Sequence, residues 1–131
     1  MQTMEGKPYF HVRKFDTVPE MIGQSASQYG ERAAVRFRRL LDQDPQTVTY
    51  SELNRDVDAL AAALIAAEMS GGRIAIVGEN SYHWILAFLA TASGVAVVVP
   101  LDRLLPEAEI LQLLIRGKVD TLFYDYAFAD R

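Results

Sequence analysis

The feature that most constrains the fold is a series of short apolar segments that have no polar face. Residues Arg73–Val77, Val95–Val99 and Val119–Tyr124 have this character, and the stretches between them, Ser81–Ser93 and Pro106–Arg116, have helical patterns. Strands that are apolar on both sides are typical of parallel sheets covered by helices on both faces. We therefore expect a three-layer α/β fold with a mostly parallel sheet, doubly wound through right-handed crossovers.

The first part of the chain predicts a helix followed by a β-hairpin. Thr17 and Glu20 have the spacing of a capping box, which indicates a helix over Val18–Tyr29 with Gly30 as a left-handed cap. Apolar and charged residues then alternate over Ala34–Leu41, which favours a half-buried strand.

A returning strand and a longer helix follow. Asp42–Pro45 is typical of a turn, and Thr47–Tyr50 completes the predicted hairpin. A second capping box, Thr49 with Glu52, opens a helix with a one-sided apolar stripe. We expect this helix to continue to about Met69, where a Ser-Gly-Gly sequence ends it.

Length and composition exclude several classes of protein. A chain of 131 residues favours one domain, and 17 acidic against 13 basic residues give a net charge of −4. That sign argues against a dedicated nucleic-acid-binding protein. The sequence contains no cysteine, which excludes disulfides, thiol catalysis and cysteine-ligated zinc.

The uncharged stretch Asn80–Leu101 is long enough to suggest a membrane span. Its first turn is polar, Gly94 interrupts it, and a β-branched run leads to Pro100. A helix, a glycine stop and a buried strand explain these features better, so we expect no transmembrane segment. Met1–Phe15 contains no continuous apolar region of a secretory signal, and we predict a cytoplasmic protein.

Three acidic residues follow predicted strands, at the sheet edge where ligands of α/β proteins bind. Glu79, Asp102 and Asp125 could hold Mg²⁺ or accept a phosphoryl group, as in a receiver-like domain using Asp102. A receiver would also need a lysine at a later strand end, which this chain lacks. Capping of turns and helices explains the same placement, and we favour it, predicting no metal site.

Nothing in the sequence predicts a catalytic or nucleotide-binding residue. The Ser70–Arg73 loop precedes a strand, whereas a phosphate-cradling loop follows a strand and opens a helix. The stretch Gly78–Ser81 has the right position but a single glycine. His83 falls in the first turn of a helix, where packing or a surface position is expected.

Several stretches nevertheless resemble one family. Val48–Leu53 resembles the first core motif of the AMP-forming adenylating enzymes, which include acyl-CoA synthetases, luciferases and peptide-synthetase adenylation domains. Ala92–Asp102 resembles their second motif, and Ile76–Trp84 is similar to the segment between them. Lys7–Arg13 and Val99–Pro106 are most similar to bacterial long-chain fatty-acid–CoA ligases.

The resemblance implies that residues 1–131 are a single truncated N-terminal subdomain of a longer enzyme. Such enzymes use ATP and Mg²⁺ to adenylate a carboxylate substrate and then transfer the acyl group to coenzyme A. The phosphate loop, the adenine pocket and the catalytic lysine of the family lie downstream of the matched region. The resemblance thus implies that this chain alone is inactive and binds no cofactor.

Three residues at strand ends, Asn80, Asp102 and Arg103, are candidates for supporting a site that other segments complete. A truncated sheet should also expose an edge or an apolar face, through which the chain could self-associate. The alternative is a free-standing α/β regulatory or binding module without catalysis.

Overall fold

Three strands form a parallel sheet in the order β4–β3–β5, and two others form a separate antiparallel hairpin, β1–β2. The structure, a computed structural model, describes residue 6, residues 13–38 and residues 44–129. The elements in chain order are α1 (Val18–Tyr29), β1 (Ala33–Phe37), β2 (Gln46–Thr49), α2 (Tyr50–Ala66), β3 (Arg73–Val77), α3 (Tyr82–Ala90), the π-helical turn η1 (Thr91–Val95), β4 (Val97–Pro100), α4 (Glu107–Gly117), β5 (Thr121–Tyr124) and the 3₁₀ turn η2 (Tyr126–Phe128).

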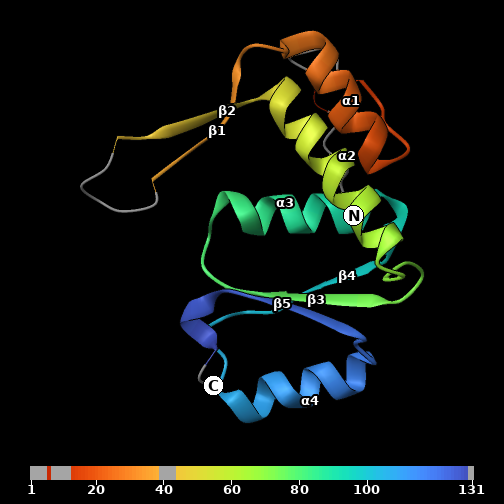
Figure 1. Ribbon diagram of the computed structural model, residues 1–131, viewed down its shortest axis with the longest axis vertical. Helices are drawn as coiled ribbons and strands as arrows, with labels where there is room; N and C mark the ends of the chain where they lie inside the picture. The colour runs from red at the N-terminus through yellow and green to blue at the C-terminus, as the bar shows by residue number, and fades with distance from the viewer. Residues whose placement is uncertain (1–5, 7–12, 39–43, 130–131) are drawn as a thin grey trace.

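The parallel sheet lies between α3 on one face and α4 on the other, and α1 and α2 pack beyond α3 (Figure 1). This arrangement confirms the predicted parallel sheet with helices on both faces, preceded by a helix and a hairpin. The chain passes from β3 to β4 on one side and then crosses to β5 on the other. It is therefore doubly wound, with β3 at the centre.

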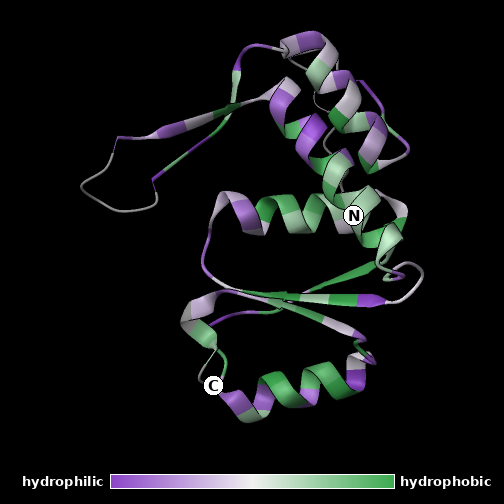
Figure 2. Ribbon diagram, in the orientation of Figure 1, coloured by the Kyte–Doolittle hydropathy of each residue, from purple (hydrophilic) through white to green (hydrophobic). Residues whose placement is uncertain are grey.

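Strand β3 forms the centre of the core. Its residues Ile74 to Val77 are all at most 4% exposed. Ile74 packs with Leu64 and Val95, whereas Ala75 and Val77 pack with Leu101 and, through Ile110 and Leu114, with α4. Figure 2 shows the sheet and α3 mainly in the hydrophobic colour, as expected for layers covered on both sides.

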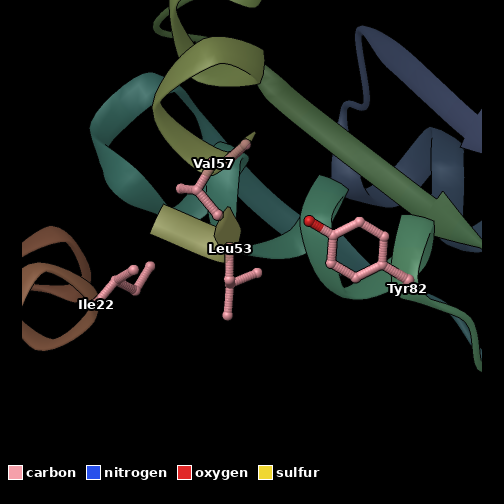
Figure 3. Close-up of a cluster of buried hydrophobic side chains, with 5 residues drawn as sticks. Ile22, Leu53, Val57 and Tyr82 are labelled. Carbon is pink, nitrogen blue, oxygen red and sulfur yellow. The ribbon is translucent and has the colours of Figure 1, made fainter. Parts of the chain in front are cut away.

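A second cluster joins the three helices on the other side of α3. Ile22 of α1, Leu53 and Val57 of α2 and Tyr82 of α3 meet there (Figure 3). The Tyr82 hydroxyl donates a hydrogen bond of 2.7 Å to a carboxylate oxygen of Asp56. The hairpin is attached at the same place, because the ring of Phe37 stacks on Tyr82 with a centroid distance of 5.4 Å.

The two predicted helix starts are found in the structure. The Thr49 hydroxyl accepts a bond from the Glu52 N–H, and the Glu52 carboxylate accepts one from the Thr49 N–H, completing the capping box. That backbone donor lowers the pKa of Glu52. At α1 the Thr17 hydroxyl accepts a bond from the Glu20 N–H. The Glu20 carboxylate, however, accepts from the N–H of Asp16 and not from that of Thr17, so the box is not closed in the same way.

Two predicted helix ends differ from the structure. Gly30 has a φ of 6° and a ψ of −80°, so it is not left-handed, although its N–H bonds to the Ala26 carbonyl. Helix α4 ends at Gly117, and Lys118 after it takes the left-handed position with a φ of 48°. Helix α2 ends at Ala66, before Met69, because Glu68 turns the chain with a φ of 60°.

The predicted buried strand Val95–Val99 is also corrected. Gly94 does stop the helix, with a φ of 95°, but the π-helical turn continues to Val95 and β4 begins at Val97. Val97 is 59% exposed because β4 lies at the edge of the sheet. Similarly, β5 begins at Thr121.

Two further predictions concern the hairpin turn and a membrane span. Residues 39–43, which include part of the predicted Ala34–Leu41 strand and of the Asp42–Pro45 turn, lie outside the described residues. Within the part of the chain that the structure describes, none of the helices has the length and apolar character needed to cross a membrane.

The Tyr82–Asp56 bond should contribute measurably to stability. Replacing Tyr82 by Phe removes a hydrogen bond to a carboxylate, and we expect a loss of about 2 kcal/mol in the free energy of unfolding by urea. The matched control is Tyr124→Phe; Tyr124 is 54% exposed, and the change should alter stability by less than about 0.5 kcal/mol.

The same pair predicts a pH dependence. Burial and the Asp56 carboxylate raise the pKa of Tyr82 above its ordinary value of 10.0. The stabilisation is therefore complete below that ordinary value and decreases as the pH rises through the raised pKa. The difference in the free energy of unfolding between wild type and Tyr82→Phe should shrink above about pH 10. A difference that stays constant would argue against ionisation of Tyr82 as the cause.

A substitution at Thr91 should increase the stability of the protein. Thr91 is fully buried, and its hydroxyl has no hydrogen-bond partner among the described residues. Thr91→Val keeps the shape and removes the unsatisfied group, so we expect thermal unfolding to show a gain of about 1 kcal/mol. Ser93→Ala, which deletes a 2.8 Å bond to the Leu89 carbonyl, should not stabilise. A destabilised Thr91→Val protein would mean that the hydroxyl is hydrogen-bonded in solution.

Candidate functional site

A crevice of about 700 Å³ lies where β3 and β5 end. The chain leaves β3 toward β4 and later crosses to β5, so the strand order reverses between β3 and β5. Crevices outside the carboxyl ends of strands at such a reversal are the usual ligand sites of open α/β sheets. Its lining comes from Gly78–Ser81 after β3, 123–125 at the end of β5, the start of α3, and Phe37 and Arg38 of the hairpin, with Leu60, Ile76 and Val77 behind them.

Aromatic and apolar side chains form most of the crevice wall. The lining residues with aromatic rings are Phe37, His83, Trp84, Phe123 and Tyr124, and they are joined by Leu86 and Ala87. Such walls favour apolar or planar groups over highly charged ones.

The local sequence fixes the ring of Trp84. Ser81 caps α3 by accepting a 3.1 Å bond from the Trp84 N–H, which places this residue in the first turn facing the crevice. Its indole stacks on Phe88, one turn further on, with a centroid distance of 5.5 Å and an interplanar angle of 12°. A ring held by both a cap and a stack is a pre-organised contact surface.

Charged side chains lie at the rim. Glu79 pairs with Arg103 across 3.3 Å, and because their side chains are 60% and 43% exposed the pair is screened by water. Asp125 packs closely on the turn after β3: a Cβ at Gly78 would lie 3.2 Å from the Asp125 Cβ. A glycine at this position therefore lets the end of β5 approach the turn.

The three candidate residues at strand ends occupy different positions. Asn80 lines the crevice. Arg103 reaches the same rim through its ion pair with Glu79. Asp102 is not part of the lining; its carboxylate accepts a 2.9 Å bond from the Leu104 N–H within its own turn. The structure thus brings Asn80 and Arg103 toward one site and leaves Asp102 in a local turn.

Sequence reasoning missed the aromatic wall. Trp84 falls at helical spacing with Phe88, which by itself indicates a packed residue, yet it is half-buried and lines the crevice. Phe123 and Tyr124 were assigned only to a strand. The available signal was their position: each lies within a few residues of the carboxyl end of a predicted strand.

The charged residues that line the crevice have both signs: Arg38 is basic, whereas Glu79 and Asp125 are acidic. Among the described residues, no group of three histidine, aspartate or glutamate residues is placed to hold a metal. The turn between β3 and α3 has one glycine. The mainly aromatic and apolar lining favours an apolar or planar group.

Comparison with known proteins places this architecture in context. The chain is 31% identical over 93 residues to the mitochondrial medium-chain acyl-CoA ligase of Danio rerio, with 70% of this chain and 15% of that protein covered. The N-terminal subdomain of Klebsiella oxytoca NpsA, bound to 3-hydroxyanthranilyl-AMSN, superposes with a TM-score of 0.76 at 29% identity, covering 87% of this chain and 28% of that one.

The O-succinylbenzoate coenzyme A synthetase of Bacillus subtilis, in complex with AMP, superposes with a TM-score of 0.72 at 26% identity, covering 82% of this chain and 27% of that chain. The chain thus spans less than a third of the length of each of these proteins. The family model for the AMP-binding enzyme matches residues 22–130, from within α1 to beyond β5. The chain belongs to the AMP-binding enzyme family and corresponds to an N-terminal portion of it.

Proposed function

We propose that residues 1–131 form a single N-terminal subdomain of a longer AMP-forming acyl-CoA ligase. The enzyme would adenylate a carboxylate, with a preference similar to that of fatty-acid–CoA ligases, using ATP and Mg²⁺, and would then transfer the acyl group to coenzyme A. The observation that carries this proposal is the family match over 22–130 in a chain that spans 15% of the acyl-CoA ligase of Danio rerio.

The crevice suggests what this portion contributes. Its aromatic wall, which includes Trp84 and Phe123, suits the apolar part of a carboxylate substrate better than a nucleotide. The relatives support this class, since one is named for medium-chain acyl groups and another for O-succinylbenzoate. We propose that Asn80 supports such a site directly, and Arg103 through Glu79.

The proposed role is structural, and we propose that the chain is catalytically inactive by itself. Phosphoryl and adenylyl chemistry depends on backbone donors, a cation and Mg²⁺ arranged around the phosphates. The described crevice has one basic and two acidic residues in its lining, and the turn between β3 and α3 has a single glycine. The remaining elements of the site would come from the rest of a longer enzyme.

Two further parts of the proposal concern partners and location. The sheet has strands at both edges whose outer side chains are exposed, which supports self-association of the isolated chain. A cytoplasmic location stays a prediction, and a relative in Danio rerio is named mitochondrial.

A free-standing binding module is the second candidate. The observation in its favour is that Ile74–Val77 of β3 are buried by elements of this chain alone, with packed residues on both faces of the strand. A unit with its own core could fold and bind a ligand without catalysis.

Calorimetric titration of the isolated chain separates the two candidates. With Mg²⁺ present we expect no heat on adding ATP, and no AMP or pyrophosphate when a fatty acid and coenzyme A are added, because the phosphate-binding elements would come from the rest of a longer enzyme. The synthetase of Bacillus subtilis, with O-succinylbenzoate as its acid, is the positive control. In parallel, the gene should continue past codon 131 into a glycine-rich threonine/serine loop. ATP binding, or a stop codon there, would favour the module.

A further inference from the structure

The hairpin and α3 both contribute to the lining of the crevice, but they are held in place differently. Phe37 and Arg38 come from the hairpin, and Trp84 comes from the first turn of α3, where the Ser81 cap and the Phe88 stack fix it locally. The hairpin pairs with no third strand among the described residues, and it extends away from α1 and α2 (Figure 1). A two-stranded sheet of this kind depends on side-chain contacts for its position.

The two ends of the hairpin have different supports. At the end next to the helices, Val35 and Val48 pack against the cluster that joins α1, α2 and α3. The last paired position of β1 is Phe37, opposite Gln46 of β2. There the ring of Phe37 stacks on Tyr82 of α3, with a centroid distance of 5.4 Å and an interplanar angle of 13°. A nearly parallel stack restricts both rings, so it holds this end of the hairpin against α3.

Tyr82 is itself fixed from the side of α2. It is 7% exposed, and its hydroxyl donates a 2.7 Å bond to one carboxylate oxygen of Asp56. The other oxygen of that carboxylate accepts bonds of 3.1 and 3.2 Å from the Arg55 guanidinium. Tyr82 does not line the crevice, because residues two positions apart on a helix, such as Tyr82 and Trp84, face different sides.

We propose that Tyr82 is a positioning residue for the crevice, which acts through Phe37 to hold the hairpin part of the wall in place. Without the stack, the hairpin moves away from α3 and the crevice widens on the side of Phe37 and Arg38. The ring carries this role, and the hydroxyl stabilises the fold through Asp56 without being needed for the stack. The consequence for ligand binding rests on the proposed function of the crevice.

Quenching of Trp84 fluorescence by acrylamide tests the position of the hairpin, because Trp84 is the single tryptophan of the chain and lines the crevice. Tyr82→Leu removes the ring that stacks on Phe37. Since Trp84 is half-buried, we expect opening of the crevice to raise the quenching constant about twofold. Tyr82→Phe keeps the ring and should be quenched like the wild type. An unchanged constant in Tyr82→Leu, or an equal rise in Tyr82→Phe, would overturn the proposal.

Two further variants separate this role from a general loss of structure. Phe37→Leu removes the same stack and leaves the Tyr82–Asp56 bond in place, so it should also raise the quenching constant, and it carries the test alone if Tyr82→Leu does not fold. Tyr29→Leu is the matched control, because it removes an aromatic pair with the same centroid distance of 5.4 Å, formed with Tyr50 away from the crevice lining. Its quenching should match the wild type, and a rise equal to that of Phe37→Leu would contradict the proposal.

Titration with decanoate measures the consequence for binding. Filling of the crevice should shift the Trp84 emission of the wild-type chain to shorter wavelength. Tyr82→Leu should weaken this binding by about tenfold, because the wall is no longer pre-organised, and Tyr82→Phe should bind as the wild type does. Equal affinity in Tyr82→Leu and wild type would overturn the proposal. Failure of the wild type to bind decanoate would count against the proposed function of the crevice, whereas the acrylamide result, which needs no ligand, still decides the role of Tyr82.

Discussion

Burial of β3 on both faces is the constraint on which the rest of the structure depends. Ile74 and Ala75 point to opposite faces, and each face needs its own cover. The chain supplies α3 on one face and α4 on the other, which requires crossover connections in both directions from the central strand. The reversal of strand order between β3 and β5 follows from that requirement, and so does the crevice at their ends.

Much of this architecture could be predicted because local signals and the hydrophobic pattern agree. The apolar run at β3 and the capping box of Thr49 and Glu52 are each specified by a few neighbouring residues. The errors occur where tertiary context decides. Val97 is apolar like its neighbours, but it is exposed because β4 lies at an edge.

The crevice could be predicted only in its location. Strand ends identify the edge of the sheet, and Asn80 was found in that way. The wall also includes Phe37 from the hairpin, which stacks on Tyr82 of α3. The two residues are far apart in sequence, so the pattern of the sequence gives no sign of this contact. Nor could spacing show that Asp102 closes its own turn while Arg103 pairs with Glu79. Asp102 and Arg103 are adjacent in sequence, and only the directions of their side chains give them different partners.

The family motifs carried by this chain have structural explanations. In the first motif, Thr49 and Glu52 form the capping box that starts α2 directly after the hairpin. In the second, Gly94 takes the positive φ that ends the π-helical turn, and Pro100 closes the outer edge of β4. Between them, Gly78 permits the close approach of Asp125 that narrows the crevice. Each of these residues shapes the backbone around β3 and its crevice, and none supplies a reacting group. A chain whose motif residues act in this way is suited to position a substrate site that other segments complete.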